Sequence, residues 1–462
     1  MADIVSELRQ QVGVETILDS ASVSMRARNY WDSTPLEALA LARPRTTDEL
    51  SRILSVCHAH GQTVVAHGGL TGVCDGDRST AGDVIVSLER MSAIEEIDVV
   101  GRTATVQSGC RLQHLQQAVE QLGLFLPLDL GARGSCTLGG NVATNAGGLN
   151  VIRFGMTRGM VLGLEAVLPD GTVISSMNRL LKNNSGYDLK QLFIGSEGTL
   201  GIVTRVVLAL KERLPSTNTA LVTIDHAEHL PTLLREMDRR LGGTVSSFEA
   251  MWGDYYREVT APGGHHSPLG RQHSFYVIVE ARGPDPVEDE HRFQAAVEAA
   301  LQGGLIVDAV LPKSETEREN IWKIRENFEA LYRYEPLFLY DVGVPLRNML
   351  EYVEGVRSDL KERWPNSRFF VLGHIGDGNL HFFVAPEVKG SNVNELHAAT
   401  DEIVYRPLGH IEGTVSAEHG IGLEKKDWLS VSRSRAEIEL MKTLKRALDP
   451  KGILNPGKVI EL

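Results

Sequence analysis

The sequence predicts an α+β protein with two domains, and three features of its pattern lead to this prediction. From Leu41 onward, short apolar runs typical of strands alternate with segments of helical period. Glycines gather in clusters between residues 67 and 203. After Leu210 the clusters end while strand and helix patterns continue, which marks the start of a second domain.

Composition narrows the class of protein. Of the 462 residues, 42% are hydrophobic and 23% are charged, as in ordinary soluble proteins. The 47 basic and 60 acidic residues give a net charge of −13, which argues against a nucleic-acid surface. We find no uncharged apolar run near the roughly 18 residues of a membrane span, so export and membrane spanning are not expected.

Cysteine usage points to a reducing compartment. The four cysteines lie far apart and form no C-x-x-C pair, so neither a zinc knuckle nor a small disulfide framework is indicated. We therefore expect a cytoplasmic protein, with peripheral contact to the inner membrane left open.

The first domain is expected to begin with one or two amphipathic helices within residues 1–30. Its later elements follow from periodicity and from capping residues. They are helices at 47–60 and 112–122 and strands at 63–66, 83–87, 103–107, 161–168 and 172–174.

A glycine loop, His67-Gly68-Gly69-Leu70-Thr71-Gly72, directly follows the strand at 63–66. Glycines at the end of a strand let backbone N–H groups approach an anionic phosphate. A plain tight turn is the alternative. The sequence contains neither a P-loop nor a G-x-G-x-x-G that opens a helix after a strand.

The densest glycine cluster spans residues 127–148, from Pro127 to Gly148. Small residues interspersed with hydroxyls and amides are typical of a backbone that lies against a large flat ligand. Leu138 and Val142 make a flexible linker a poor alternative, because a linker has no need of large apolar side chains.

The second domain carries the pattern of an α+β cap, with strands expected at 220–224, 244–249 and 274–280 and helices at 226–241 and 288–301. A further helix is predicted over 317–334. Its period places Trp322, Arg325 and Glu329 on one stripe, so Arg325 could simply pair with Glu329.

The stretch 372–384 predicts a β-hairpin around Asp377-Gly378, the typical pair of a two-residue type I′ turn. In that register His374 faces His381, with Cβ atoms roughly 4.5–5.5 Å apart, close enough to hold one metal ion together. Two histidines on a solvated strand face are the alternative.

Five stretches together resemble the flavin-dependent 2-hydroxy acid dehydrogenases of the vanillyl-alcohol-oxidase flavoprotein fold. They are residues 67–72, 127–148, 182–203, 373–382 and 416–422, and the likeness runs from Leu41 to the C-terminus. The resemblance implies an FAD-binding domain of two subdomains within 1–212 and an α+β cap, with the substrate and metal site, within 213–425. A C-terminal segment, 426–462, would return to the FAD domain.

The resemblance also implies which residues bind FAD. Members with covalent flavin often carry a histidine where this chain has Leu70 and Thr71, so we expect non-covalent FAD. The implied contacts are His67, Gly68, Gly69, Leu70, Thr71, Gly72, Pro127, Gly139, Gly140, Asn141, Asn145, Gly147, Gly148, Glu197, Gly198, Ile202 and Asn455.

For catalysis, the resemblance implies a divalent ion, Zn or Mn, held by His374, His381 and Glu418. Two histidines and a carboxylate with an open position form a catalytic rather than a structural set. His419 would be the general base, although a His-Gly pair could merely cap a helix. Arg325 would bind the substrate carboxylate through its planar guanidinium.

Three residues depart from the relatives that act on D-2-hydroxyglutarate: Glu329, Leu339 and Phe383 replace a threonine, a lysine and an asparagine. These changes remove partners for a second carboxylate, which would then be costly to desolvate. We therefore expect a D-2-hydroxy acid with an apolar or aromatic side chain, such as lactate, a branched 2-hydroxy acid or mandelate.

Other functions remain as alternatives. The first is D-2-hydroxyglutarate dehydrogenase itself. A metal hydrolase with the same His, His, Glu set and a non-redox FAD enzyme of the same fold are more distant. As partners we expect an electron acceptor, such as a quinone or an electron-transfer flavoprotein, and a second copy of the chain in a homodimer. NAD is not expected, because no second dinucleotide fingerprint is present.

Overall fold

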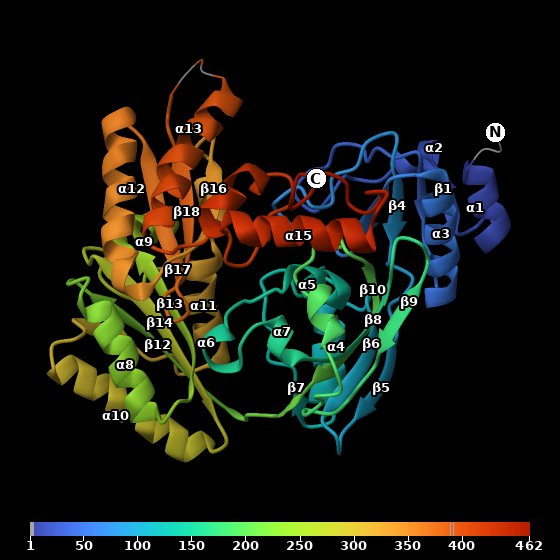
Figure 1. Ribbon diagram of the computed structural model, residues 1–462. Coiled ribbons are helices and arrows are strands. Elements are labelled where there is room, and N and C mark those ends of the chain that lie inside the picture. The colour runs from blue at the N-terminus through green and yellow to red at the C-terminus, as the bar shows by residue number, and fades with distance from the viewer. Residues whose placement is uncertain (1–3, 389, 391) are drawn as a thin grey trace. The chain divides into compact units, whose positions relative to one another are not determined.

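The computed structural model describes residues 4–388, 390 and 392–462, and the chain divides into two compact units (Figure 1). The first unit holds the chain up to Gly148, then Gly155–Arg213 and Glu418–Leu462. The second holds Leu149–Phe154 and Leu214–Ala417. These bounds differ from the expected domains at three places: residues 149–154 belong to the second unit, and Arg213 and residues 418–425 belong to the first.

The first unit contains two main sheets. A four-stranded sheet has the order β1 (Ile17–Asp19), β2 (Ala40–Ala42), β4 (Val84–Ser87), β3 (Val64–His67), in which β2, β4 and β3 run parallel. A five-stranded antiparallel sheet has the order β5 (Ile94–Asp98), β6 (Thr103–Gln107), β10 (Ile202–Ala209), β8 (Val161–Val167), β9 (Val173–Ser176). Strands β7 (Leu124–Phe125) and β11 (Lys211–Glu212) form a small separate pair.

The helices of the first unit come from all three of its chain segments. They are α1 (Ile4–Val12), α2 (Ser20–Val23), α3 (Thr47–His60), α4 (Leu112–Glu120), α5 (Leu138–Thr144), α7 (Thr157–Met160), α14 (Leu429–Ser432) and α15 (Arg435–Leu448), with short 3-10 turns η1 (Leu189–Leu192) and η5 (Lys426–Trp428). Helix α15 begins with a capping box, in which Ser434 and Glu437 satisfy each other's backbone N–H groups.

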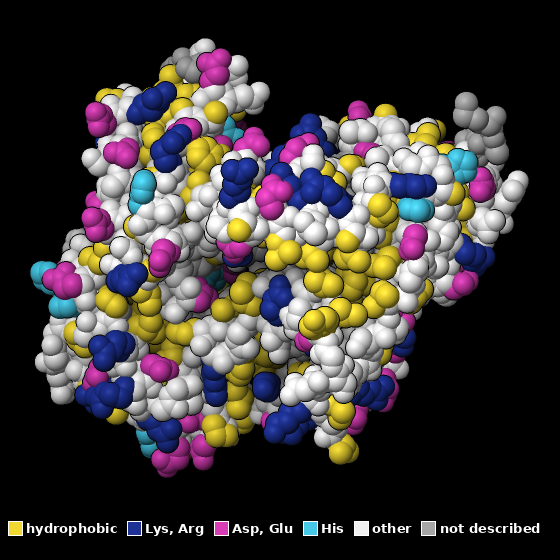
Figure 2. Space-filling view, in the orientation of Figure 1, with side chains coloured by type: hydrophobic (Ala, Val, Ile, Leu, Met, Phe, Trp, Pro, Cys, Tyr) yellow, Lys and Arg dark blue, Asp and Glu magenta, His cyan; other side chains and the backbone are white. Residues whose placement is uncertain are grey.

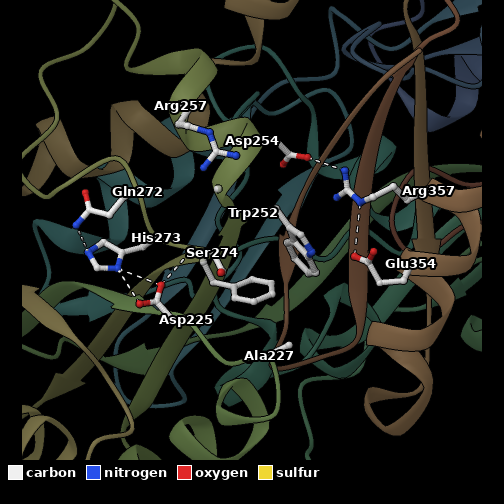
Figure 3. Close-up of a pocket in the computed structure, with 12 residues that line it drawn as sticks. Asp225, Ala227, Trp252, Asp254, Arg257, Gln272, His273, Ser274, Glu354 and Arg357 are labelled. Carbon is white, nitrogen blue, oxygen red and sulfur yellow. Dashed lines mark hydrogen bonds and ion pairs between the residues drawn. The ribbon is translucent and has the colours of Figure 1, made fainter. Parts of the chain in front are cut away.

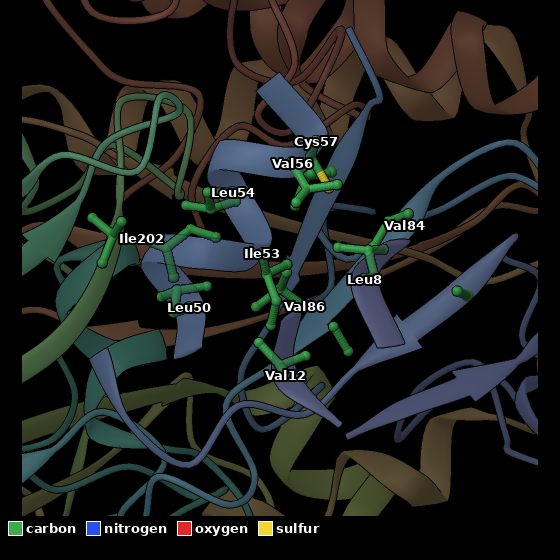
Figure 4. Packing of buried hydrophobic residues seen from close by; sticks show 14 of the residues in the cluster. Leu8, Val12, Leu50, Ile53, Leu54, Val56, Cys57, Val84, Val86 and Ile202 are labelled. Carbon is green, nitrogen blue, oxygen red and sulfur yellow. The ribbon is translucent and has the colours of Figure 1, made fainter. Parts of the chain in front are cut away.

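Helix α3 shows how local sequence and packing agree in this unit. The Thr46 hydroxyl caps its N-terminus by accepting from the Glu49 N–H, and Gly61 ends it with φ of +64°. Its buried stripe packs with α1, β4 and the start of β10 in one apolar core (Figure 4). That core includes Leu8, Val12, Leu50, Ile53, Leu54, Val56, Cys57, Val84, Val86 and Ile202.

The second unit is built on one antiparallel seven-stranded sheet. Its order is β15 (Asp308–Val310), β12 (Ser216–Ile224), β14 (Phe275–Gly283), β13 (Val245–Trp252), β17 (Arg368–His374), β18 (Asn379–Ala385), β16 (Phe338–Gly343). The central strands are buried along their whole length, as expected for a sheet covered on both faces.

Helices cover the two faces of this sheet separately. One face carries Leu372 and Phe383 and packs against α9 (Gly253–Val259), α11 (Glu315–Glu326) and the 3-10 turn η2 (Phe328–Leu331). The other face packs against α8 (His229–Leu241) and α10 (Pro286–Gln302), and against α12 (Met349–Arg363), where Tyr352 stacks on Phe382. The remaining elements are α6 (Val151–Phe154), η3 (Leu346–Asn348), α13 (Val393–Tyr405) and η4 (Arg406–His410).

Most elements expected from periodicity are present within a few residues of their predicted bounds. Two differences bear on function. The helix predicted over 317–334 ends at Glu326, and a separate 3-10 turn follows. The glycine cluster at 127–148 contains a helix, α5, capped at Thr137.

Candidate functional site

The hairpin of β17 and β18 brings His374 and His381 together, but not in the expected register. His374 pairs with Asn379 and His381 pairs with Leu372, so four residues rather than two form the loop. The prediction of a two-residue turn is therefore wrong. The shift is two residues along the strand, so both histidines still lie on one face as diagonal neighbours. Their ring centroids are 5.3 Å apart.

Local contacts explain the longer loop. The His374 carbonyl accepts from the N–H groups of both Asp377 and Gly378, and the Asp377 carboxylate accepts from the Asn379 N–H. Gly378 has φ of +85°, and a Cβ there would lie 2.7 Å from the Val344 oxygen. The Asp-Gly pair thus sits inside a wider turn that is pinned to the segment after β16.

His374 is held by a buried carboxylate that the sequence prediction missed. Its Nδ1 lies 2.6 Å from Oε1 of Glu249, which is the residue opposite it on β13. An ionised carboxylate can only accept, so Nδ1 carries the proton and donates to Glu249. Nε2 is then the acceptor nitrogen, and it lies 3.3 Å from a guanidinium nitrogen of Arg325.

Arg325 completes a buried triangle with these two residues. Its Nε donates to Oε2 of Glu249 at 3.1 Å. Burial alone would raise the pKa of Glu249, but the charge of Arg325 and the hydrogen bonds from His374 and Arg325 outweigh burial and lower this pKa below its usual value. Glu249 is therefore ionised at neutral pH. Arg325 does not pair with Glu329, the simpler interpretation of its spacing, within the described part of the chain.

One guanidinium nitrogen of Arg325 remains available. Nη1 donates to none of the residues that the structure describes, whereas Nε and Nη2 are engaged by Glu249 and His374. The side chain is 11% exposed. A buried arginine with free N–H donors is well suited to bind an incoming carboxylate.

His381 lies near a second buried carboxylate. Asp341, which pairs with it across β16 and β18, places Oδ1 4.0 Å from the His381 Nδ1. Asp341 also accepts from the side-chain amide of Asn379 at 2.8 Å and from the Ala417 N–H at 3.2 Å. The Oδ1 atom of Asn379 is buried and has no hydrogen-bond partner among the described residues, so it is an acceptor that faces no donor.

The predicted substrate residues fall into different environments. Phe383 is two residues from His381 on the same face and is 4% exposed, with its ring 6.2 Å from that of Phe328. Leu339 pairs with Phe383 and is 42% exposed. Glu329 is exposed on η2, because the helix that would have aligned it with Arg325 ends at Glu326.

Glu418 and His419 belong to the first unit. They are the first two residues of its last chain segment, Glu418–Leu462, which follows directly after the second unit. Both are partly buried. The residue before them, Ala417, is anchored to Asp341 by its N–H. Consecutive Cα atoms lie about 3.8 Å apart, so the chain itself limits how far Glu418 can lie from that anchor.

The glycine loops expected to bind the cofactor contact each other inside the first unit. A Cβ on Gly69 would lie 2.4 Å from the Ser135 oxygen, and one on Gly68 would lie 2.8 Å from Oγ1 of Thr137. Only glycine permits this approach. The backbone N–H groups of residues 68–72 donate to no residue in the described part of the chain. The loop therefore offers free donors of the kind that bind a phosphate.

Residues 139–141, which are also implied FAD contacts, differ from the loop at 68–72 in their backbone hydrogen bonds. The N–H groups of Gly139, Gly140 and Asn141 donate to Ser108, to the Thr137 hydroxyl and to the Thr137 carbonyl. These amides already have partners within the protein. The FAD contact implied for residues 139–141 stays a prediction. Of these two segments, only residues 68–72 have backbone N–H groups without a partner among the described residues.

Glu197 and Asn455 connect several of the predicted cofactor residues. The Asn455 side chain accepts from the Ala66 N–H at 2.9 Å and donates to the Glu197 carbonyl at 2.6 Å. A Cβ on Gly198 would lie 2.7 Å from the same Asn455 amide. Residues at 66, 197–198 and 455 thus meet in one place. Their contact with FAD stays a prediction.

The remaining residues that were predicted to bind the cofactor lie in different environments, and several of them are buried in the first unit. His67 is 2% exposed and contacts the Asp77 carbonyl at 2.8 Å, and burial lowers its pKa to about 4. Ile202 belongs to the apolar core of Figure 4. Asn145 ends α5 with φ of +50°. Pro127, Gly147 and Gly148 lie in the loops on either side of α5, and Leu70 has φ of +55°.

The residues that sequence reasoning missed are the buried polar partners, Glu249, Asp341 and Asn379. Glu249 carried a usable signal, because it is the one charged residue in the otherwise uncharged run Val245–Trp252. A charge inside a fully buried strand needs a partner. Nothing in the sequence identified which partner that would be.

A surface pocket of the second unit lies apart from these residues (Figure 3). Trp252 and Phe275 meet edge-on at 5.3 Å on its floor, and Arg357 pairs there with Asp254 at 2.7 Å. Neither His374, His381 nor Arg325 lines it. Its charged groups largely satisfy one another, so we assign the chemistry to the hairpin and not to this pocket.

Solved structures share this fold. The structure of p-cresol methylhydroxylase aligns with a TM-score of 0.75 over 99% of this chain and 96% of that one, at 15% identity. Alkyldihydroxyacetonephosphate synthase aligns with a TM-score of 0.73 over 98% and 84%, at 17% identity. The fold is that of the vanillyl-alcohol-oxidase flavoproteins, as predicted. With its glycine loops it defines the class: an FAD-binding protein.

Sequence comparison gives the family. Residues 38–176 match the FAD binding domain, and residues 213–459, more than half of the chain, match the FAD linked oxidases, C-terminal domain. The chain belongs to the family of FAD-linked oxidases. It is an FAD-dependent oxidoreductase that acts on CH–OH groups.

Individual relatives are similar over most of their length. D-2-hydroxyglutarate dehydrogenase, mitochondrial, of Bos taurus is 40% identical over 91% of this chain and 76% of its own. D-2-hydroxyglutarate dehydrogenase of Xanthomonas citri pv. viticola is 37% identical over 93% and 90%. Putative D-lactate dehydrogenase C713.03, mitochondrial, of Schizosaccharomyces pombe is 36% identical over 90% and 81%.

These names correct one prediction. A cytoplasmic location was expected from cysteine usage, but several of the similar relatives are named mitochondrial, which contradicts it. All four cysteines are reduced and buried. Among the described residues, no helix has both the length and the apolar character needed to cross a membrane.

Proposed function

We propose that this chain oxidises a D-2-hydroxy acid to the corresponding 2-oxo acid. The observation that carries the proposal is the free Nη1 of Arg325, buried beside the acceptor nitrogen of His374. An α-hydroxy acid presents a carboxylate and a hydroxyl on adjacent carbons. A guanidinium donor next to a ligand nitrogen matches that pair of groups.

The residues of the site fit a divalent ion, Zn or Mn. Glu249 holds the proton of His374 on Nδ1, the usual arrangement for a ligating histidine, so Nε2 carries the lone pair. That lone pair accepts from Arg325 Nη2, and an ion bound at Nε2 would replace this hydrogen bond. His374, His381 and Glu418 would hold the ion, which would supply Lewis acidity to the substrate hydroxyl. The anchoring of Ala417 to Asp341 supports the inclusion of Glu418.

The first unit fits FAD through the free backbone donors of residues 68–72 and the close-packed glycines beside them. Bound FAD would accept the two electrons of the oxidation. An imidazole nitrogen of His419 takes the hydroxyl proton, the usual role of a histidine that acts as general base. Arg325 Nη1 binds the carboxylate and thereby fixes the orientation of the α-carbon.

D-2-hydroxyglutarate is the first candidate substrate. Its support is the group of relatives named for it, which are similar over 90% or more of this chain. The electron acceptor would be a quinone or an electron-transfer flavoprotein, and the functional unit would be a homodimer.

A hydrophobic D-2-hydroxy acid is the second candidate, and one observation favours it. Phe383 packs on Phe328, and Leu339 lies beside Phe383, on the strand face that carries His381. This apolar surface would suit the side chain of lactate, of a branched 2-hydroxy acid or of mandelate. The exposed position of Glu329 weakens one part of the original argument, because a solvated carboxylate repels a second one only weakly.

Anaerobic reduction of the bound flavin tests the proposal. The purified protein is mixed with D-2-hydroxyglutarate, D-lactate, D-2-hydroxyisocaproate or D-mandelate, with each L-enantiomer as control, and bleaching of flavin absorbance is followed. The highest ratio of reduction rate to Kd identifies the substrate, and a hydrophobic acid in first place selects the second candidate. If all D-acids leave the flavin oxidised, the proposed function is overturned.

A further inference from the structure

The carboxylate of Glu197 holds a turn of the chain. Its Oε1 accepts from the Ile421 N–H at 2.7 Å, and its Oε2 accepts from the Gly422 N–H at 2.8 Å. Both oxygens are thus engaged by consecutive backbone amides. Such charge-assisted bonds are about twice as strong as neutral ones.

The turn that Glu197 holds comes immediately after Glu418 and His419. Gly420 has φ of +85°, and a Cβ there would lie 2.8 Å from Oε1 of Glu197. Gly422 has φ of +53°, and its Cβ would lie 1.9 Å from the Cys74 carbonyl. Two glycines therefore let the turn approach Glu197 on one side and Cys74 on the other.

The backbone of Glu197 is itself fixed. Its N–H donates to the Ala143 carbonyl of helix α5 at 2.8 Å, and its carbonyl accepts from Asn455 at 2.6 Å. Its φ of +51° is unusual for a residue with a side chain. Structures maintain such a conformation only where their surroundings enforce it, which often occurs at functional sites.

We propose that Glu197 is a positioning residue that sets the place of Glu418 and His419 relative to the glycine loops of the first unit. This rests on the proposed function in so far as His419 is taken as the base. The carboxylate acts through the backbone of residues 420–422 and not by touching the substrate. The earlier expectation placed Glu197 among the cofactor contacts; the geometry assigns its side chain to the turn instead.

Glu197→Gln is the test variant. It keeps the size of the side chain but replaces one acceptor oxygen by an NH₂ group that cannot accept an amide hydrogen. We expect the rate of flavin reduction and kcat to fall about 10- to 100-fold, because small misplacements of a reacting group cost that much. The KM for the D-2-hydroxy acid and the ratio of FAD to protein should stay at wild-type values.

Glu165→Gln is the matched control. Glu165 is also a buried carboxylate of the first unit, on β8, and it accepts from Thr47 and Thr204 through Oε1. It has no contact with the turn at 420–422 among the described residues. Its replacement should leave kcat and KM within about threefold of wild type.

Two further measurements separate positioning from a merely structural role. In a double-mutant cycle with His419→Ala, the loss from Glu197→Gln should be smaller than in the wild-type background, since one of the two groups that Glu197 places is gone. Hydrogen exchange of the Ile421 and Gly422 amides should accelerate at least about tenfold in Glu197→Gln and not in Glu165→Gln. This second measurement does not depend on turnover.

Several results would overturn the proposal: full kcat in Glu197→Gln, unchanged exchange of the two amides, activity restored by added FAD, or losses that multiply with those of His419→Ala. The wild-type reduction assay is read first. If wild type fails with every D-2-hydroxy acid, the proposed function fails, and the exchange measurement still decides whether Glu197 anchors the turn.

Discussion

Arg325 and His374 share one buried carboxylate, that of Glu249, and this sharing determines what each can do. Glu249 accepts from Nδ1 of His374 and from two nitrogens of Arg325. The Nε2 lone pair of His374 accepts from Arg325 Nη2, so the Nη1 donors of Arg325 are what remains for a substrate. Glu249, which need not touch the substrate, therefore determines which hydrogen-bond donors and acceptors of His374 and Arg325 can interact with other groups.

Replacing Arg325 by lysine keeps the positive charge but removes the planar set of guanidinium donors, so it tests which of the two binds the substrate carboxylate. An ammonium cannot contact Glu249 and also present a pair of donors to the substrate carboxylate, so KM should rise about 10- to 100-fold, the cost of a lost charge-assisted hydrogen bond. Steady-state kinetics with D-2-hydroxyglutarate and D-lactate measure it. Arg318→Lys is the control, because Arg318 lies on the same helix and pairs with the buried Glu280. An unchanged KM in Arg325→Lys would refute the assignment.

His67 should make the first unit sensitive to acid. Burial lowers its pKa from 6.5 to about 4, so between these values the unfolded chain binds a proton that the folded chain does not. This contribution to the free energy of unfolding is present above pH 6.5 and is lost as the pH falls toward 4. It amounts to up to about 3 kcal/mol.

Denaturant unfolding of wild type and His67→Gln at pH 7 and pH 4.5 checks this contribution. Glutamine can still donate to the Asp77 carbonyl but does not titrate. The variant should therefore lose less stability on acidification than wild type does. Equal losses in both proteins would show that His67 does not bind a proton on unfolding in this range.

At the scale of elements, the β17–β18 hairpin depends on its turn. The wide loop places four residues between His374 and Asn379 and pins Gly378 against the segment after β16. The two histidines keep a common face only because the register moved by an even number of residues. A shift by one residue would have sent one of them to the opposite face of the sheet.

Gly378→Ala should destabilise this hairpin. Its φ of +85° and the 2.7 Å approach of a Cβ to the Val344 oxygen both oppose a side chain, at a cost of about 1–3 kcal/mol. Gly355→Ala is the control in the same unit. It lies inside helix α12 with nothing within 4 Å, and should stabilise by about 0.5–1 kcal/mol. Thermal unfolding of both variants measures the effects, which should have opposite signs.

The contact between the two glycine loops should control cofactor binding. In Gly69→Ala the new Cβ would lie 2.4 Å from the Ser135 oxygen, so the loops must separate. We expect purified Gly69→Ala to contain much less FAD, seen as a fall in the ratio of flavin to protein absorbance. Gly159→Ala, with open space around it in the same unit, should retain FAD. Full occupancy in Gly69→Ala would contradict the cofactor role of this loop.

At the scale of the whole molecule, each unit draws on distant parts of the chain. The first unit collects residues around 67, 139, 197, 420 and 455, and the second collects residues around 249, 325, 341, 374 and 381. Acidic and basic side chains are interspersed over the face shown in Figure 2. The proposed reaction needs groups from both units, so neither unit is expected to act alone.

Removal of the proposed metal ion should show which effects depend on the metal and which depend on FAD. Dialysis against a chelator should abolish turnover while leaving the flavin bound, because the histidines of the hairpin and the glycine loops belong to different units. Added Zn or Mn should restore activity, which metal analysis and flavin absorbance follow together. Activity that survives complete removal of divalent metal would rule out the proposed ion.

The sequence was enough to predict those features of the fold and the site that depend on residues close together in the chain. The strands and helices around α3, the glycine loop after β3 and the histidines of the hairpin all carry period, capping or turn signals. The end of α11 at Glu326 carried no such signal, since an apolar stripe continues through Phe328 and Leu331. Packing of Phe328 on Phe383 accompanies this break.

The sequence by itself determined that this is an FAD-dependent oxidoreductase of the vanillyl-alcohol-oxidase fold, because its five motif stretches together resemble those of that family. Only the tertiary structure decided the register of the hairpin, the partners of His374 and Arg325, and the hold of Glu197 on the turn at 420–422. The side-chain hydrogen bonds of His374, Arg325 and Glu197 join residues 49 to 225 positions apart. Local propensity does not act over such separations, whereas burial does, since each buried charge must find a partner.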